Sequence, residues 1–113
     1  MSKSIMHSKA SHTCYLCMAL HNDYTMKFYL EEHHVFGGTP NRRHSEHYGL
    51  KVYLCPEHHR TSDEAVHRPD RNKNQKLLQA AGQREFKKWY PGEDFVKIFG
   101  KNYCEEGEES DRQ

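Results

Sequence analysis

The chain has 113 residues, of which 35% are hydrophobic and 29% are charged, and its formal net charge is +1. This length fits one small domain, and a mean hydropathy of −1.10 leaves little apolar material for a core, so a bound metal is expected to support the fold. No apolar run is long enough to span a membrane, and residues 1–9 are too polar for a secretory leader. We therefore expect a protein of the reducing cytoplasm, where paired thiols bind metal rather than form disulfides.

Charge is distributed unevenly along the chain. Residues 104–113 carry five acidic side chains against Arg112, a net charge of −4, which leaves +5 on residues 1–103. We expect residues 1–12 to be a flexible N-terminus, residues 13–103 to form a single domain, and residues 104–113 to be an acidic disordered tail. A basic body of this size is compatible with a polyanionic partner.

In chain order, the first elements expected are two strands and a helix. The apolar and aromatic run at residues 27–30 favours a strand that leads into residues 32–36. A glycine pair with Thr-Pro-Asn then predicts a loop at residues 37–41. Alternating apolar residues over 50–55 predict a second strand, and the proline that follows it favours a helix over residues 56–68.

Two further helices are expected in the remainder of the chain. The first begins beyond Asp70 and ends before Pro91, and Gly82 weakens it by ~1 kcal/mol. Its helical pattern is expected to run through Leu78, Ala81, Glu85 or Phe86, and Trp89. The second is a short helix over residues 95–99 that ends at Gly100. The order of elements indicates an α+β protein.

Two pairs of soft metal ligands, each separated by two residues, lie 41 positions apart in this chain. They form a Cys3His set: Cys14, Cys17, Cys55 and His58. Thiolates suit Zn2+, and two such pairs brought together give the closed tetrahedral site of a structural zinc. Cys104 and His12 compete for the place of the fourth ligand.

An adjacent histidine pair, His33 and His34, lies between the two ligand pairs. In a strand, neighbouring side chains point to opposite faces, so the two imidazoles cannot easily bind one metal together. They can divide the work: one coordinates an ion while the other serves as a general base, for which an imidazole is suited near neutral pH.

The chain resembles the HNH endonucleases, which have the ββα-metal fold. The resemblance implies a treble-clef-like ββα-metal core with a zinc knuckle, followed in this chain by C-terminal helices. The resemblance rests on Cys-x2-Cys, then His-His-Val, a glycine-rich loop and Leu-Cys-x2-His-His. Small phage and prophage HNH proteins with a structural zinc are the most similar in pattern, both at Glu32–Gly38 and at Asp94–Gly100. The resemblance covers roughly residues 13 to 103 and implies a metal-dependent endonuclease that hydrolyses DNA in the cytoplasm of a phage-infected or prophage-bearing host.

The resemblance also implies roles for individual histidines. His34 would be the general base, and His33 and His59 would bind a catalytic divalent ion (Mg2+, Mn2+, Ni2+ or Zn2+). His67 is the preferred third ligand, since it lies two helical turns past His59 if the helix persists, and Asp63 is its rival. His58 would stand in the zinc site where the family more often has a cysteine.

The central asparagine of the HNH motif has no clear counterpart. Asn41 lies seven residues past His34, and His44 and His47 are the other candidates for orienting the base.

Phosphate contacts would come from nearby cations, for which the candidates are Arg42, Arg43 and Arg60. The alternative functions are a catalytically inactive zinc-stapled module that binds DNA or protein, and a nuclease acting on RNA.

Overall fold

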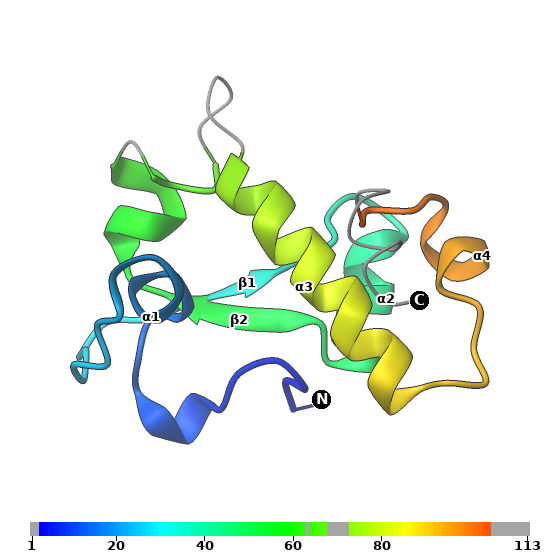
Figure 1. Cartoon of the computed structure of the whole chain (residues 1–113). Coiled ribbons are helices and arrows are strands. Elements are labelled where there is room, and N and C mark those ends of the chain that lie inside the picture. The colour runs from blue at the N-terminus through cyan, green and yellow to red at the C-terminus, as the bar shows by residue number, and fades with distance from the viewer. Residues whose placement is uncertain (1–2, 63, 68–72, 105–113) are drawn as a thin grey trace.

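The computed structural model describes residues 3–62, 64–67 and 73–104. It is a small α+β protein in which helices surround a two-stranded sheet (Figure 1). The strands are β1 (Glu31–His34) and β2 (Lys51–Leu54), and the helical elements are η1 (Lys9–Ser11), α1 (Tyr15–His21), α2 (Asn41–Tyr48), η2 (Glu57–Thr61), α3 (Lys73–Trp89) and α4 (Phe95–Phe99). Within these described ranges, no helix has the length and apolar character that a membrane span requires.

The two strands pair in antiparallel register, with Glu31 opposite Leu54 and His34 opposite Lys51. Val52 and Leu54 enter the core, as the alternating pattern predicts. Lys51 is also buried, on the face of the sheet opposite to Val52 and Leu54. Its burial is possible because the ammonium group is paired with the carboxylates of Glu32 and Glu46. Both faces of β2 are therefore covered.

Residues 4–7 cover the edge of β2 that does not face β1. The Ile5 N–H donates to the Gly49 carbonyl at 2.9 Å, and the Tyr53 N–H donates to Nδ1 of His7 at 3.1 Å. This part of the expected flexible N-terminus thus lies along the sheet. The expected acidic tail, from residue 105 onwards, is outside the described residues.

Residues 27–30 do not form the predicted strand. The exposed fractions of Phe28 and Tyr29 are 94% and 80%. β2 ends at Leu54, opposite the first residue of β1, and Pro56, which has no N–H to donate, turns the chain into η2. In the described part of the chain, residues 27–30 consequently have no strand to pair with.

Helix α2 occupies a stretch for which the sequence predicted no element. Ser45 is the one fully buried residue of this helix, so α2 has no apolar stripe that periodicity could detect. The sequence features that indicate this helix lie at its two ends. Pro40 precedes it, and Gly49 ends it in the left-handed conformation at φ +77°.

The helix predicted over residues 56–68 is much shorter than expected. It is a single turn of the π type, η2, which ends at Thr61. The following turn is held by a hydrogen bond of 2.9 Å from the Val66 N–H to the His58 carbonyl, which brings residues 64–67 back towards η2. The expectation that His67 follows His59 on one continuous helix is wrong.

Helix α3 is confirmed, and it crosses the sheet in Figure 1. Leu78 and Phe86 are fully buried, whereas Trp89, at the last position of the helix, is 60% exposed and not part of the core. Gly82 has a packing role: a Cβ there would lie 3.2 Å from the ring of Phe36. The missing side chain therefore lets α3 approach the segment that follows β1.

The short helix α4 is confirmed with both of its ends. The Asp94 side chain accepts from the Lys97 N–H at its start, and Gly100 closes it at φ +96°. Phe95 and Phe99 pack against Phe36 with ring centroids 5.3 and 4.9 Å away. These aromatic contacts close the core beside α2.

Candidate metal centres

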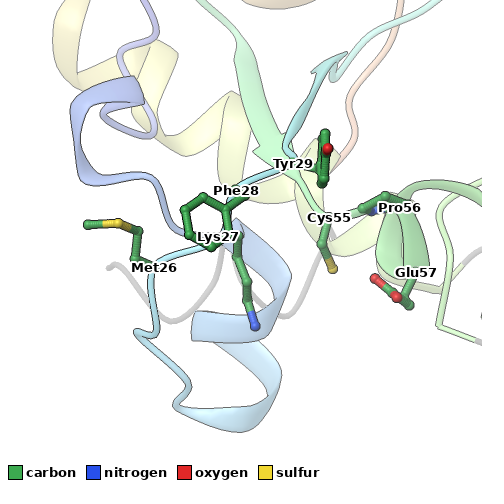
Figure 2. Close-up of a pocket in the computed structure, with 7 residues that line it drawn as sticks. All are labelled: Met26, Lys27, Phe28, Tyr29, Cys55, Pro56 and Glu57. Atoms are coloured by element: carbon green, nitrogen blue, oxygen red, sulfur yellow. The ribbon is translucent and has the colours of Figure 1, made fainter.

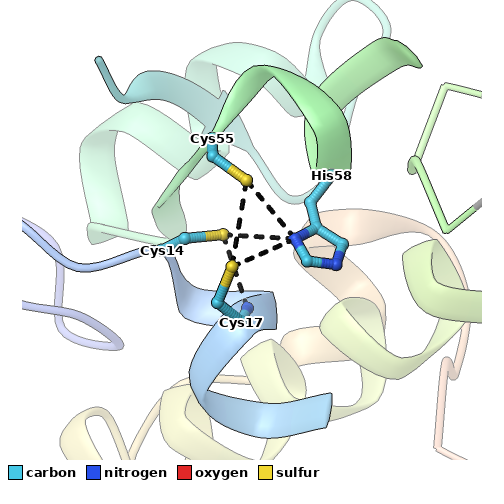
Figure 3. A group of neighbouring side chains, drawn as sticks. All are labelled: Cys14, Cys17, Cys55 and His58. Carbon is cyan, nitrogen blue, oxygen red and sulfur yellow. Dashed lines mark hydrogen bonds between the residues drawn. The ribbon is translucent and has the colours of Figure 1, made fainter. Parts of the chain in front are cut away.

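The predicted Cys3His set comes together from three elements (Figure 3). The pair Cys14 and Cys17 opens α1, Cys55 follows β2, and His58 lies in η2. The three sulfur atoms lie 3.4–3.6 Å from Nδ1 of His58, and the Cys17 and Cys55 sulfurs are 3.9 Å apart. Zinc bonds of ~2.3 Å to sulfur and ~2.05 Å to nitrogen in a tetrahedron give a sulfur–nitrogen edge of about 3.6 Å and a sulfur–sulfur edge of about 3.8 Å. The cluster therefore fits a metal such as zinc.

The environment of this Cys3His cluster favours a bound cation. Burial, followed by the neighbouring thiols, raises the pKa of Cys17 to about 12, so this thiol holds its proton unless a cation displaces it. On the other side of the His58 ring, Nε2–H donates to Oε1 of Glu64 at 2.7 Å, and His21 donates to the same oxygen at 2.8 Å. Glu64 thereby fixes the tautomer in which Nδ1 of His58 is free to bind metal.

The two competing zinc ligands lie elsewhere. His12 is an exposed residue at the end of η1. Cys104 is buried, and its thiol donates to the Ala80 carbonyl at 3.6 Å. Neither residue belongs to the Cys3His cluster.

A surface pocket borders the Cys3His cluster on its Cys55 side (Figure 2). Its lining includes the exposed rings of Phe28 and Tyr29 together with Cys55, Pro56 and Glu57. The segment wrongly predicted as a strand therefore contributes exposed aromatic surface next to the cluster.

A second group consists of His33, His59 and His67, called here the histidine triad. One ring nitrogen from each residue lies within 4.8 Å of the other two, and Nε2 of His59 is 3.0 Å from Nε2 of His67. Two nitrogens that share an ion at ~2.1 Å are about 3.0–3.4 Å apart, so the spacing suits a metal. His33 and His59 are buried while His67 is exposed, which leaves one side of the triad open.

Hydrogen bonds outside the triad show which ring nitrogens of His33 and His59 carry the lone pairs. Gln75 donates from Nε2 to the Val35 carbonyl at 2.8 Å, so its oxygen accepts from Nε2–H of His33 at 2.8 Å. Oε1 of Glu31 accepts from Nδ1–H of His59 at 2.5 Å. Neutral imidazole carries one proton, so the lone pairs are on Nδ1 of His33 and Nε2 of His59.

Burial is the main cause of the pKa shifts of His33 and His67. Burial lowers the pKa of His33 to about 4 and also lowers the pKa of His67, in each case helped by neighbouring imidazoles. The hydrogen bond from His59, followed by that from Arg60, lowers the pKa of Glu31. Neutral rings beside an ionised carboxylate are the form in which such residues bind a cation.

His34 lies on the opposite face of β1, as alternation along a strand predicts. Its Nε2–H donates to Oε1 of Glu46, on α2, at 2.8 Å. Lys51, the cross-strand neighbour of His34, donates to Glu46 and is paired with Glu32 at 3.0 Å. The adjacent histidines therefore have different neighbours: His33 lies among other imidazoles, and His34 lies among charged side chains.

The three candidates for the role of the orienting asparagine make their described contacts with residues other than His34. Asn41, at the start of α2, donates from Nδ2 to the Phe99 carbonyl at 3.1 Å. The ring of His44 packs edge-on against Phe99, and the ring of His47 against Tyr48.

The three candidate phosphate contacts fall in two places. Arg60 is 59% exposed and donates to Glu31, which places it beside the triad. Arg42 and Arg43 are exposed in the first turn of α2, one turn before Glu46. Asp63, the rival third ligand, is outside the described residues.

Four residues that hydrogen-bond the histidines of the candidate site were not predicted from the sequence: Glu31, Glu46, Glu64 and Gln75. Glu31 carried a usable signal, because a residue two positions before His33 shares its face in a strand. The other three reach their histidines from separate elements, and no spacing rule predicts such contacts.

In comparisons with known proteins, no family model matches this chain, and no curated protein sequence or solved structure is significantly similar to it.

Proposed function

We propose that this protein is a metal-dependent endonuclease of the HNH type that hydrolyses phosphodiester bonds in DNA, with a ββα-metal core formed by β1, β2 and η2. The observation that carries the proposal is the division of β1 into two faces. His33 belongs to an open triad of imidazoles on one face, and His34 is hydrogen-bonded to a carboxylate on the other.

In this proposal the Cys3His cluster holds a structural zinc and the histidine triad holds the catalytic ion. That ion, when bound, compensates charge on the scissile phosphate and on the leaving oxygen. His34 accepts the proton of the attacking water at Nδ1, because its Nε2 already carries a proton that is donated to Glu46. Arg60, beside the triad, is the cation best placed to contact a flanking phosphate.

The test is nicking of supercoiled plasmid by the zinc-loaded protein with Mg2+, Mn2+, Ni2+ or Zn2+, and with EDTA. We expect metal-dependent nicking that EDTA abolishes. A shift of DNA on a gel without cutting would support the binding module instead, and cutting of RNA alone would replace DNA as the substrate.

Two substitutions separate the proposed roles of the histidines. His34→Ala is expected to abolish nicking while the triad still binds Mn2+, since a base is not a ligand. His59→Ala is expected to lose both nicking and Mn2+ binding, measured by calorimetric titration. His12→Asn serves as the control for loss of an exposed histidine. Unchanged Mn2+ binding by His59→Ala would remove this residue from the site.

A further inference from the structure

We propose that Glu46 is the positioning residue of His34, which it holds with the proton on Nε2 and the lone pair on Nδ1. The inference rests on the proposed function, because a general base needs orientation only if the protein hydrolyses its substrate. It gives Glu46 the orienting role for which the sequence offered Asn41, His44 and His47.

The first support is the contact itself. Oε1 of Glu46 accepts from Nε2–H of His34 at 2.8 Å, and the exposed fractions of the two side chains are 30% and 13%. A carboxylate can accept but not donate, so this bond requires the proton to be on Nε2 of His34. The remaining nitrogen, Nδ1, is then the acceptor that a general base needs.

The second support is that the Glu46 carboxylate has little freedom to turn. Both of its oxygens accept from the ammonium group of Lys51 at 3.1 Å. The Lys51 side chain is only 2% exposed, and its other carboxylate partner is Glu32 at 3.0 Å. If Glu46 rotated away, a buried charge would lose one of two counter-ions, which is costly.

The third support is the attachment of α2 to the end of β1. The Ser45 hydroxyl accepts from the Phe36 N–H at 3.0 Å and donates to the Phe36 carbonyl at 2.9 Å. The Leu50 N–H donates to the Ser45 carbonyl at 2.8 Å, and the Val35 N–H donates to the Leu50 carbonyl at 3.0 Å. The residue before Glu46 is thus fixed to the residues that follow His34.

A positioning role and a purely structural ion pair predict different behaviour. If Glu46 only neutralises Lys51, its removal lowers the melting temperature and leaves turnover unchanged in the protein that remains folded. If Glu46 orients His34, its removal lowers kcat and releases the His34 tautomer, while the KM for DNA is kept. Gln at this position keeps an acceptor oxygen for His34 but loses the charge that Lys51 requires.

The experiment compares Glu46→Ala, Glu46→Gln and Glu85→Ala in the zinc-loaded protein with Mn2+, well below each melting temperature. Glu85 is the matched control, because it is 31% exposed, lies on a helix and pairs with Lys88. We expect Glu46→Ala to lower kcat by about 10- to 100-fold with KM changed less than roughly twofold. Glu46→Gln should recover part of kcat, and Glu85→Ala should resemble the parent.

Nitrogen chemical shifts of His34 give a readout independent of cleavage. The parent should show a proton on Nε2, and Glu46→Ala should show a mixture of both tautomers. Cleavage by the parent with an unchanged kcat in Glu46→Ala would overturn the positioning role and leave the proposed function standing. A parent that cuts no nucleic acid with any of the metals would overturn both, whatever the tautomer.

Discussion

Removing one thiol from the Cys3His cluster should cost the protein much of its stability. The change is Cys17→Ala, at a side chain that is 7% exposed and whose sulfur lies 3.5 Å from Nδ1 of His58. Structural zinc sites contribute about 10–16 kcal/mol at pH 7, which is about 2.5–4 kcal/mol for each of four ligands. In a domain of this size, the melting temperature should fall by roughly 10–20 °C.

The assay is thermal unfolding followed by circular dichroism, combined with the zinc content of the purified protein. Cys104→Ala is the matched control, since Cys104 is equally buried but lies outside the Cys3His cluster. It should keep one tightly held zinc and lose only the stability expected for a small core truncation. The reasoning is refuted if Cys17→Ala retains its zinc and melts together with the Cys104→Ala control.

Three further outcomes are expected from the groups around the two centres. Glu64→Gln should weaken zinc binding about 10- to 100-fold, measured in competition with a chelator, because an amide oxygen is a weaker acceptor for the His58 ring than a carboxylate. Unchanged zinc affinity would show that Glu64 does not fix this ring. His33 should titrate near pH 4 in metal-free protein by NMR, because burial disfavours its charged form, and a midpoint above 6 would contradict the buried environment. Burial also lowers the pKa of His7 below 6.5, so its contribution to stability is present above pH 6.5 and is lost as the pH falls through the lower folded value. In urea unfolding at pH 7.5 and 5, the free energy of unfolding should depend less on pH in His7→Gln than in the parent. An equal pH dependence in the two proteins would exclude His7 as its source.

The parts of the site that the sequence predicted are those governed by local spacing. Two ligands separated by two residues can bind one metal ion from a single turn of the chain. The sequence alone therefore pairs Cys14 with Cys17 and Cys55 with His58. The opposite orientation of His33 and His34 follows from the period of a strand. These rules involve only neighbours in the chain.

The parts that were missed depend on how the chain returns on itself. His67 does lie beside His59, but the turn after η2 places it there and not a continuous helix. Glu46 reaches His34 from a helix without an apolar stripe, so neither the helix nor the contact left a periodic signal. The burial of Lys51 was likewise invisible, because a lysine is normally buried only when acids from other segments neutralise it.

The N-terminal segment also covers a strand edge that could otherwise pair with another chain. A strand edge with free backbone groups is a template for pairing with other chains. Here the hydroxyl of Ser4 donates to the Lys51 carbonyl at 2.5 Å, and Ile5 and His7 occupy further backbone groups along this edge of β2. In a shortened protein that starts at Thr13, this edge of the buried strand β2 would be exposed. Aggregation of such a protein is therefore the outcome expected from the loss of this edge cover.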